Sequence, residues 1–69
     1  SDIRNGDSVV VKWNKKSGVV MDTCLVSDKV RFGTNYKVLV CKIKFNDGTT
    51  DIIPSFELKL MVLAELKRI

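Results

Sequence analysis

The chain has 69 residues, the size of one small domain. Hydrophobic residues make up 45% of the chain and charged residues 29%, a balance typical of a folded globular domain, which excludes an intrinsically disordered chain. A net charge of +4 permits weak attraction to nucleic acid or to an anionic surface without requiring it.

The first three quarters of the chain alternate apolar and polar residues with the period of two that is typical of β-strands. We expect a first strand over 6–13, with Val9, Val11 and Trp13 on one face. A polar turn over 14–18 then leads to a second strand over 19–27, which is apolar on both faces in places. A longer loop over 28–36 follows.

A third strand is expected over 37–45, with one apolar face made of Leu39, Cys41, Ile43 and Phe45. Lys42 and Lys44 point from its other face. The segment 46–48, Asn-Asp-Gly, predicts a tight hairpin turn because these residue types tolerate positive φ. A fourth strand covers 49–53, and Pro54 ends its hydrogen-bond ladder.

After Pro54, the segment 55–58 predicts one turn of 3₁₀ or α-helix with Ser55 as its N-cap. A fifth strand over 59–63 and a short helical or frayed end follow. Five short strands joined mostly by tight turns favour closure into a small barrel, which hides the sheet edges. The short connections and the turn before the last strand favour an SH3-like barrel over an OB-like one. We therefore expect a single all-β domain over 1–69, with its core at about 6–63, excised from a longer protein.

The chain lacks the residues that most enzymes and metal sites need. It has two cysteines and no histidine, which excludes the usual four-ligand zinc sites and removes the commonest general base. With no Gly-rich phosphate loop and no paired carboxylates, we expect neither enzyme activity nor a cofactor. We expect Cys24 and Cys41 to be buried reduced thiols, with a disulfide as the alternative, and Met21 and Met61 to fill the core. The sequence has no run near the roughly 20 apolar residues that span a bilayer, so no membrane insertion is expected.

Two short motifs carry a resemblance to a known family. Gly6, Val9 and Trp13 form a Gly-x-x-Val-x-x-x-Trp pattern, and the segment 45–48 is an aromatic-x-Asp-Gly hairpin followed by a strand, a helical turn and a Leu-containing last strand. This layout resembles the Tudor family, and most closely the methyl-lysine-reading Tudor domains of DNA-damage checkpoint mediators and of the lamin B receptor. The resemblance covers about 6–63, with one insertion at 28–36.

The resemblance implies a chromatin-associated, nuclear binding module that recognises a methylated histone tail through a cage of aromatic rings and one carboxylate. By position, Trp13 and Phe45 would be two walls and Asp47 the acidic member. Val20 and Thr49 stand where the family commonly has further aromatic residues, so the cage is partial. Two aromatic residues on or beside the insertion could fold back and complete it, namely Phe32 and Tyr36.

Other interpretations of the same residues remain open. Trp13 and Phe45 are equally understandable as packing residues, and Asp47 as an ordinary turn residue. A second functional class is a basic barrel that binds DNA or RNA, with phosphate contacts from Lys12, Lys15, Lys16, Arg31, Lys42 and Lys44. A third is a structural protein–protein interaction module, in which the apolar tail packs on an adjacent tandem domain or a second copy.

Overall fold

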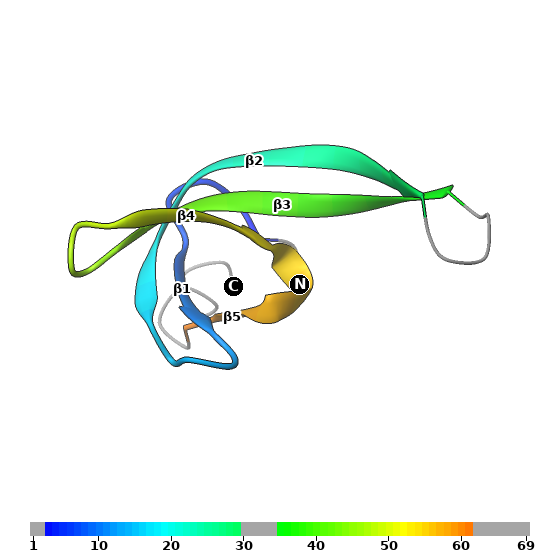
Figure 1. Ribbon diagram of the computed structural model, residues 1–69. Coiled ribbons are helices and arrows are strands. Elements are labelled where there is room, and N and C mark those ends of the chain that lie inside the picture. Colours follow the sequence, from blue (N-terminus) through cyan, green and yellow to red (C-terminus); the bar gives the residue numbers. More distant parts are fainter. Residues whose placement is uncertain (1–2, 30–34, 62–69) are drawn as a thin grey trace.

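The protein is an all-β domain built on one antiparallel sheet. The computed structural model describes residues 3–29 and 35–61. Within them lie five strands and one 3₁₀ turn: β1 (Ser8–Val11), β2 (Ser17–Lys29), β3 (Asn35–Phe45), β4 (Thr50–Pro54), η1 (Ser55–Glu57) and β5 (Leu58–Leu60). The strand order across the sheet is β4-β3-β2-β1-β5, and every neighbouring pair is antiparallel (Figure 1).

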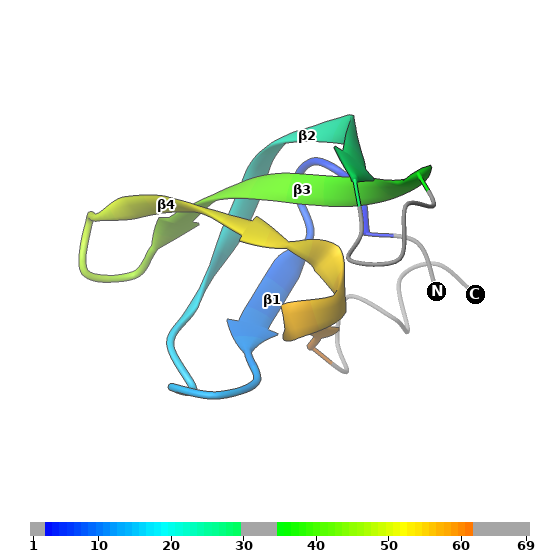
Figure 2. The same cartoon turned by 45° about the vertical axis from the view of Figure 1, so that its right-hand side comes forward.

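The sheet curls so that the end of the described chain returns to its beginning. The 3₁₀ turn η1 joins β4 to β5, the two outer strands of the sheet, and β5 pairs with β1 (Figure 2). The Lys12 N–H donates to Glu57 O at 2.9 Å, and the Met61 N–H donates to Ser8 O at 3.0 Å. These bonds hold the last strand against the first, which is the architecture of a small SH3-like barrel and confirms the expected fold.

The core lies on the inner face of the curled sheet. Alternate residues of β1 and β3 are buried there, as the period-two pattern predicts, and Leu39 packs against them. The buried hydrophobic residues are Ile3, Val9, Val11, Val20, Cys41, Ile43, Phe45, Ile53, Leu58 and Leu60. The segment 46–48 forms the predicted hairpin turn, with Gly48 at φ +89° and the Gly48 N–H donating to Phe45 O at 3.0 Å.

A β-bulge in β2 changes which residues face the core. The pairing of β2 with β3 shifts its register between Val20 and Asp22, which leaves Met21 as the extra residue. The Asp22 carboxylate accepts the Thr23 N–H at 2.9 Å within this bulge. Met21, next to the buried Val20, is 52% exposed, and the shift turns Cys24 to the exposed side, so the prediction that both residues are buried is wrong. Both cysteines are free thiols.

Several expected boundaries also change. The first strand ends at Val11 rather than at position 13, because the chain turns at once toward β2, and Trp13 is not part of it. Pro54 caps η1, so the expected N-cap role of Ser55 is wrong, and Met61 is exposed rather than in the core. The fifth strand is Leu58–Leu60; the remainder of the expected strand and the tail beyond it lie outside the described residues.

The expected loop over 28–36 is shorter than predicted. The ladder between β2 and β3 continues through the pairs Asp28↔Tyr36 and Lys29↔Asn35, because continued pairing satisfies backbone groups that a loop would leave to solvent. In Figure 1 this hairpin projects beyond the rest of the sheet. Among the described residues, helical structure amounts to the turn η1, and no helix there has the length and apolar character to span a membrane.

The outer edge of β4 offers no free backbone N–H at two positions, Ile52 and Pro54. The Phe45 N–H donates to Thr49 O at 2.8 Å, so these two residues form a hydrogen-bonded pair. Along an antiparallel ladder, hydrogen-bonded and non-hydrogen-bonded pairs alternate. Ile52 therefore falls in a non-hydrogen-bonded pair, and its N–H points away from β3. The Asp51 carboxylate accepts that N–H at 2.8 Å. Pro54, the last residue of β4, has no N–H.

Candidate functional site

The candidate site forms where the turn between β1 and β2 meets the hairpin between β3 and β4. The Asn46 N–H donates to Ser17 O at 3.1 Å, and the Asn46 side-chain amide donates to Ser17 Oγ at 2.9 Å. Gly18 pairs with Phe45 at this junction. A Cβ on Gly18 would collide with Lys44 O and lie 2.8 Å from Phe45 Cα, so only glycine lets the two strands approach this closely.

Asp47 is held in one orientation by the residue that follows the turn. Its Oδ1 accepts two hydrogen bonds from Thr49, one from the N–H at 2.9 Å and one from the hydroxyl at 2.6 Å. Its Oδ2 lies 3.2 Å from Lys16 Nζ. The pKa of Asp47 is lowered to about 2, first by the Thr49 hydroxyl, then by the Thr49 N–H and by Lys16. Asp47 therefore stays anionic, with one oxygen fixed and the other facing a cation.

Phe45 supplies an aromatic wall to the same place. Its ring belongs to the core, at 6% exposure, yet Lys16 Nζ lies 4.7 Å from the ring centroid. This distance is within the range of a cation–π contact. A shallow hollow of about 250 Å³ surrounds the contact, and its lining residues are Lys15, Lys16, Ser17, Phe45, Asn46 and Asp47. Phe45 and Asp47, which the Tudor resemblance places in one cage, thus line one hollow, and the ammonium of Lys16, which also lines it, contacts both of them.

Trp13 lies on the turn beside this hollow but does not line it. The turn is closed by the Lys15 N–H donating to Val11 O at 2.9 Å and by the Lys16 N–H donating to Asn14 Oδ1 at 3.0 Å. Lys15 has a φ of +63°, in the left-handed region. Trp13 is 67% exposed on this turn, so its ring is available to a partner and contributes little to the core.

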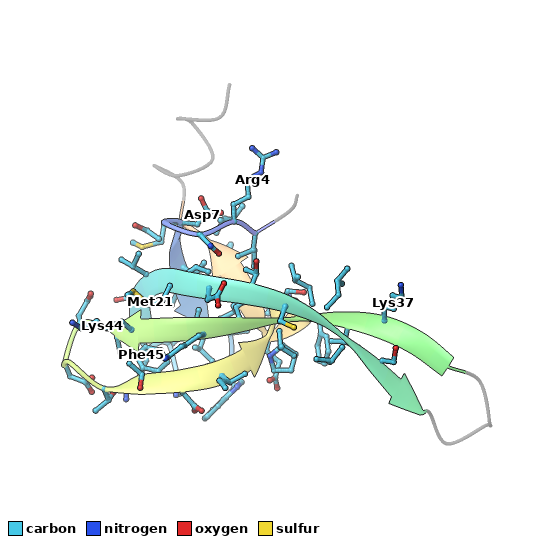
Figure 3. The ribbon with its side chains drawn as sticks, turned by 90° about the horizontal axis from the view of Figure 1, so that it is seen from above. Arg4, Asp7, Met21, Lys37, Lys44 and Phe45 are labelled. Atoms are coloured by element: carbon cyan, nitrogen blue, oxygen red, sulfur yellow. The ribbon has the colours of Figure 1, made fainter. Side chains whose placement is uncertain are left out.

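Of the other aromatic candidates, Tyr36 stands at the end of β3 that is far from the hollow. Tyr36 is near the start of β3 and Phe45 is its last residue, so up to about 30 Å of extended strand separates them at 3.3 Å per residue. Figure 3 shows this separation through Lys37 and Phe45, which are labelled at opposite ends of β3. Phe32 lies outside the described residues. Val20 is buried, and Thr49 positions Asp47 rather than forming a wall.

The cationic residues of the nucleic-acid interpretation that the structure describes lie on the turn between β1 and β2 and on β3. Lys16 is paired with Asp47, and Lys12 Nζ donates to Phe56 O at 2.9 Å. Lys42 and Lys44 are exposed on the outer face of β3, and Lys42 is directly opposite Asp22 of β2. Lys15 lines the hollow, and Arg31 lies outside the described residues.

Two residues of the site were not assigned their positions by the sequence. The Tudor resemblance marks Thr49 only as a position without the usual aromatic residue, although an Asp side chain commonly hydrogen-bonds the backbone two residues on. The sequence suggests Lys16 only as a phosphate contact, and nothing in its local sequence indicates a contact with Phe45.

The described residues contain no group of three or more His, Cys, Asp or Glu side chains that could hold a metal ion. No protein-family model, curated protein or solved structure matches this chain. The interpretation of the site therefore depends on its own geometry and chemistry.

Proposed function

We propose that this domain is a binding module that takes a methylated lysine side chain of a partner protein between the Phe45 ring and the Asp47 carboxylate. One observation carries the proposal: a lysine ammonium, that of Lys16, lies 4.7 Å from the ring centroid and 3.2 Å from the carboxylate oxygen. A site that accommodates this ammonium has the dimensions and the charge for the same group on another chain.

The chemistry favours methylated forms of lysine that keep an N–H. A methylammonium retains its charge but is weakly hydrated, so an aromatic face attracts it at a lower desolvation cost than an unmodified ammonium. Asp47 Oδ2 accepts a hydrogen bond from a mono- or dimethylammonium and none from a trimethylammonium. Trp13, exposed on the adjacent turn, is the candidate second ring.

The cellular role in the proposal comes from the Tudor resemblance. That resemblance suggests a methylated histone tail as the partner and the nucleus as the location, with the domain acting beside others in a longer protein. Nucleic-acid binding is the weaker interpretation, because two of the described lysines, Lys12 and Lys16, are engaged within the domain.

The test is a chemical-shift titration of the ¹⁵N-labelled domain with peptides that differ only in one lysine: unmodified, dimethylated or trimethylated. We expect the dimethylated peptide to bind most tightly and to shift the amides of Ser17 and of residues 45–49. Asp47→Asn should abolish binding because it removes the charge while keeping a turn-compatible residue. Asp51→Asn, which makes the same charge change on the outer strand, is the matched control and should bind normally.

Two outcomes would contradict the proposal. Equal affinity for all three peptides would reject recognition of methylation. Shifts confined to Lys42 and Lys44, obtained with a short DNA duplex and weakening steeply as salt is raised, would favour the nucleic-acid interpretation instead.

A further inference from the structure

At the hollow, the contact position beside the Phe45 ring and the Asp47 carboxylate is already taken by a side chain of the same domain. Lys16 Nζ makes both contacts that the proposed ligand would make, one with the Phe45 ring and one with Asp47 Oδ2. A partner lysine cannot occupy the same position at the same time. Lys16 therefore has to leave the ring and the carboxylate before a ligand can take its place.

The Lys16 side chain is suited to leaving and returning. It is 43% exposed and the Asp47 side chain 52% exposed, so water can solvate both groups when they separate. Its backbone stays anchored throughout, because Lys16 O accepts the Val11 N–H at 2.8 Å and the Lys16 N–H donates to Asn14 Oδ1. Only the side chain needs to change its rotamer.

Asp47 does not depend on Lys16 for its position. The two hydrogen bonds from Thr49 hold Oδ1 whether or not Lys16 is in contact, so Oδ2 remains directed at the hollow. The vacated site therefore keeps its geometry for an incoming cation. Thr49 orients the carboxylate whereas Lys16 contacts it as a ligand would, so Lys16 can be replaced by a ligand without disturbing the carboxylate.

From these contacts we propose that Lys16 is a tethered competitor, which sets the affinity of the site by occupying it in the free protein. This inference rests on the proposed function, because it assumes that the hollow is where a ligand lysine binds. The apparent dissociation constant rises as the fraction of protein with a vacant site falls. If Lys16 occupies the hollow about three quarters of the time, the apparent affinity is lowered about fourfold.

Occupation by Lys16 changes affinity but leaves selectivity unchanged. An unmodified ligand lysine offers the same ammonium that Lys16 already supplies and gains little by replacing it. A dimethylated lysine is less strongly hydrated and interacts better with the ring, so it displaces Lys16 more readily. The competitor lowers the apparent affinity for both ligands by the same factor, so the preference for the methylated lysine comes from the ring and the carboxylate and not from Lys16.

The experiment uses three proteins: the native domain, Lys16→Ala and Lys16→Arg. The probe is a peptide of glycine and serine with one dimethyllysine. Lys16→Ala vacates the hollow, and we expect its affinity to rise about fourfold. Lys16→Arg keeps the net charge but supplies a planar group that pairs with a carboxylate through two bonds and stacks on a ring, so its affinity should fall.

Lys44→Ala is the control for charge. It removes one positive charge from the exposed residue next to Phe45, on the opposite face of β3, and it does not line the hollow (Figure 3). Its affinity should stay within about twofold of the native value. A rise equal to that of Lys16→Ala would mean that long-range charge, and not occupation of the site, explains the effect.

A direct readout needs no ligand. The Lys16 ε-methylene protons should resonate upfield of an ordinary lysine because they lie over the Phe45 ring, and the dimethyllysine peptide should return them to the ordinary position. If the upfield shift is present but Lys16→Ala and Lys16→Arg bind as the native domain does, the competitor role is rejected while the proposed function stands. If none of the proteins binds the peptide, the proposed function fails, and the competitor role fails with it.

Discussion

The hydroxyl of Thr49 donates to Oδ1 of Asp47 at 2.6 Å, and this bond orients the carboxylate so that its other oxygen faces Lys16. Asp47 in the turn and Thr49 directly after it thus present an anionic oxygen at the surface. The arrangement is local in sequence, and its effect on the site can be measured through the titration of one group.

We predict that Thr49→Val raises the pKa of Asp47 from about 2 toward the ordinary aspartate value near 3.9, because it removes the largest cause of the lowering. The measurement is a carbon-detected titration of the Asp47 carboxyl group. Thr50→Val is the matched control, since Thr50 is also exposed but makes no bond to Asp47. An unchanged pKa in Thr49→Val would show that Lys16 alone keeps the carboxylate ionised.

The same lowered pKa predicts a pH dependence of stability. The carboxylate is favoured in the folded state, so Asp47 contributes its full stabilisation above about pH 4 and loses it as pH falls toward 2. Urea unfolding of the native domain and of Asp47→Asn, measured between pH 2 and pH 5, should give free-energy differences that shrink as pH falls. A difference that is constant across this range would contradict the role of the ionised form.

Alanine substitutions at Gly18 and Gly48 distinguish the cost of a steric clash from the cost of a positive φ. Gly18→Ala forces a Cβ against the backbone at Lys44 O and should cost at least about 2 kcal/mol of unfolding free energy, because neither strand can yield easily. Gly48→Ala meets nothing within 4 Å and should cost about 1 kcal/mol for its positive φ. Urea denaturation of both variants tests this order, and equal costs would show that the close contact of β2 with β3 relaxes.

The two aromatic residues near the hollow should respond differently to truncation. Trp13→Ala should change the unfolding free energy by no more than about 0.5 kcal/mol because the side chain is 67% exposed, yet it should weaken dimethyllysine binding several-fold. Phe45→Ala should destabilise the domain by about 3–5 kcal/mol as a core truncation. Thermal unfolding and peptide titration measure the two effects. Unaltered binding by Trp13→Ala would remove it from the site.

The cysteines should differ in reactivity. Cys24 is exposed, whereas Cys41 is buried and burial raises the pKa of its thiol, which lowers the fraction of reactive thiolate. We predict that iodoacetamide modifies Cys24 in the native domain at neutral pH and reaches Cys41 only in denaturant. Mass spectrometry of the intact protein and its peptides gives the result. Rapid modification of Cys41 under native conditions would indicate local opening between β3 and its neighbours.

Much of the fold follows from the sequence because local patterns determine it. The alternation through Leu39, Cys41, Ile43 and Phe45 predicts a strand with one buried face, and the structure has it. The Asn-Asp-Gly turn is equally local. The exposure of Cys24 does not follow, since one bulge residue exchanges the two faces of β2 beyond Val20 and no period-two pattern marks where that happens.

The candidate site is less predictable than the fold. Phe45 and Asp47 lie close together because only Asn46 stands between them in the hairpin, so their proximity could be predicted. The contact with Lys16 depends on the register that pairs Gly18 with Phe45, which joins distant parts of the chain. No periodic pattern in the sequence shows where the long, flexible Lys16 side chain lies. Its position can be inferred only once the pairing register of β2 with β3 is known.

The lack of a free N–H at two positions on the outer edge of β4 affects how the domain behaves at high concentration. An outer strand with free N–H groups is a template on which a strand of another molecule can be added, and such additions lead to aggregates. Here the Asp51 carboxylate already holds the Ile52 N–H, and Pro54 has none to offer. An incoming strand would find two successive outward positions without a donor. The 65% exposed Ile52 side chain can thus lie on the surface without nucleating a β-aggregate at this edge.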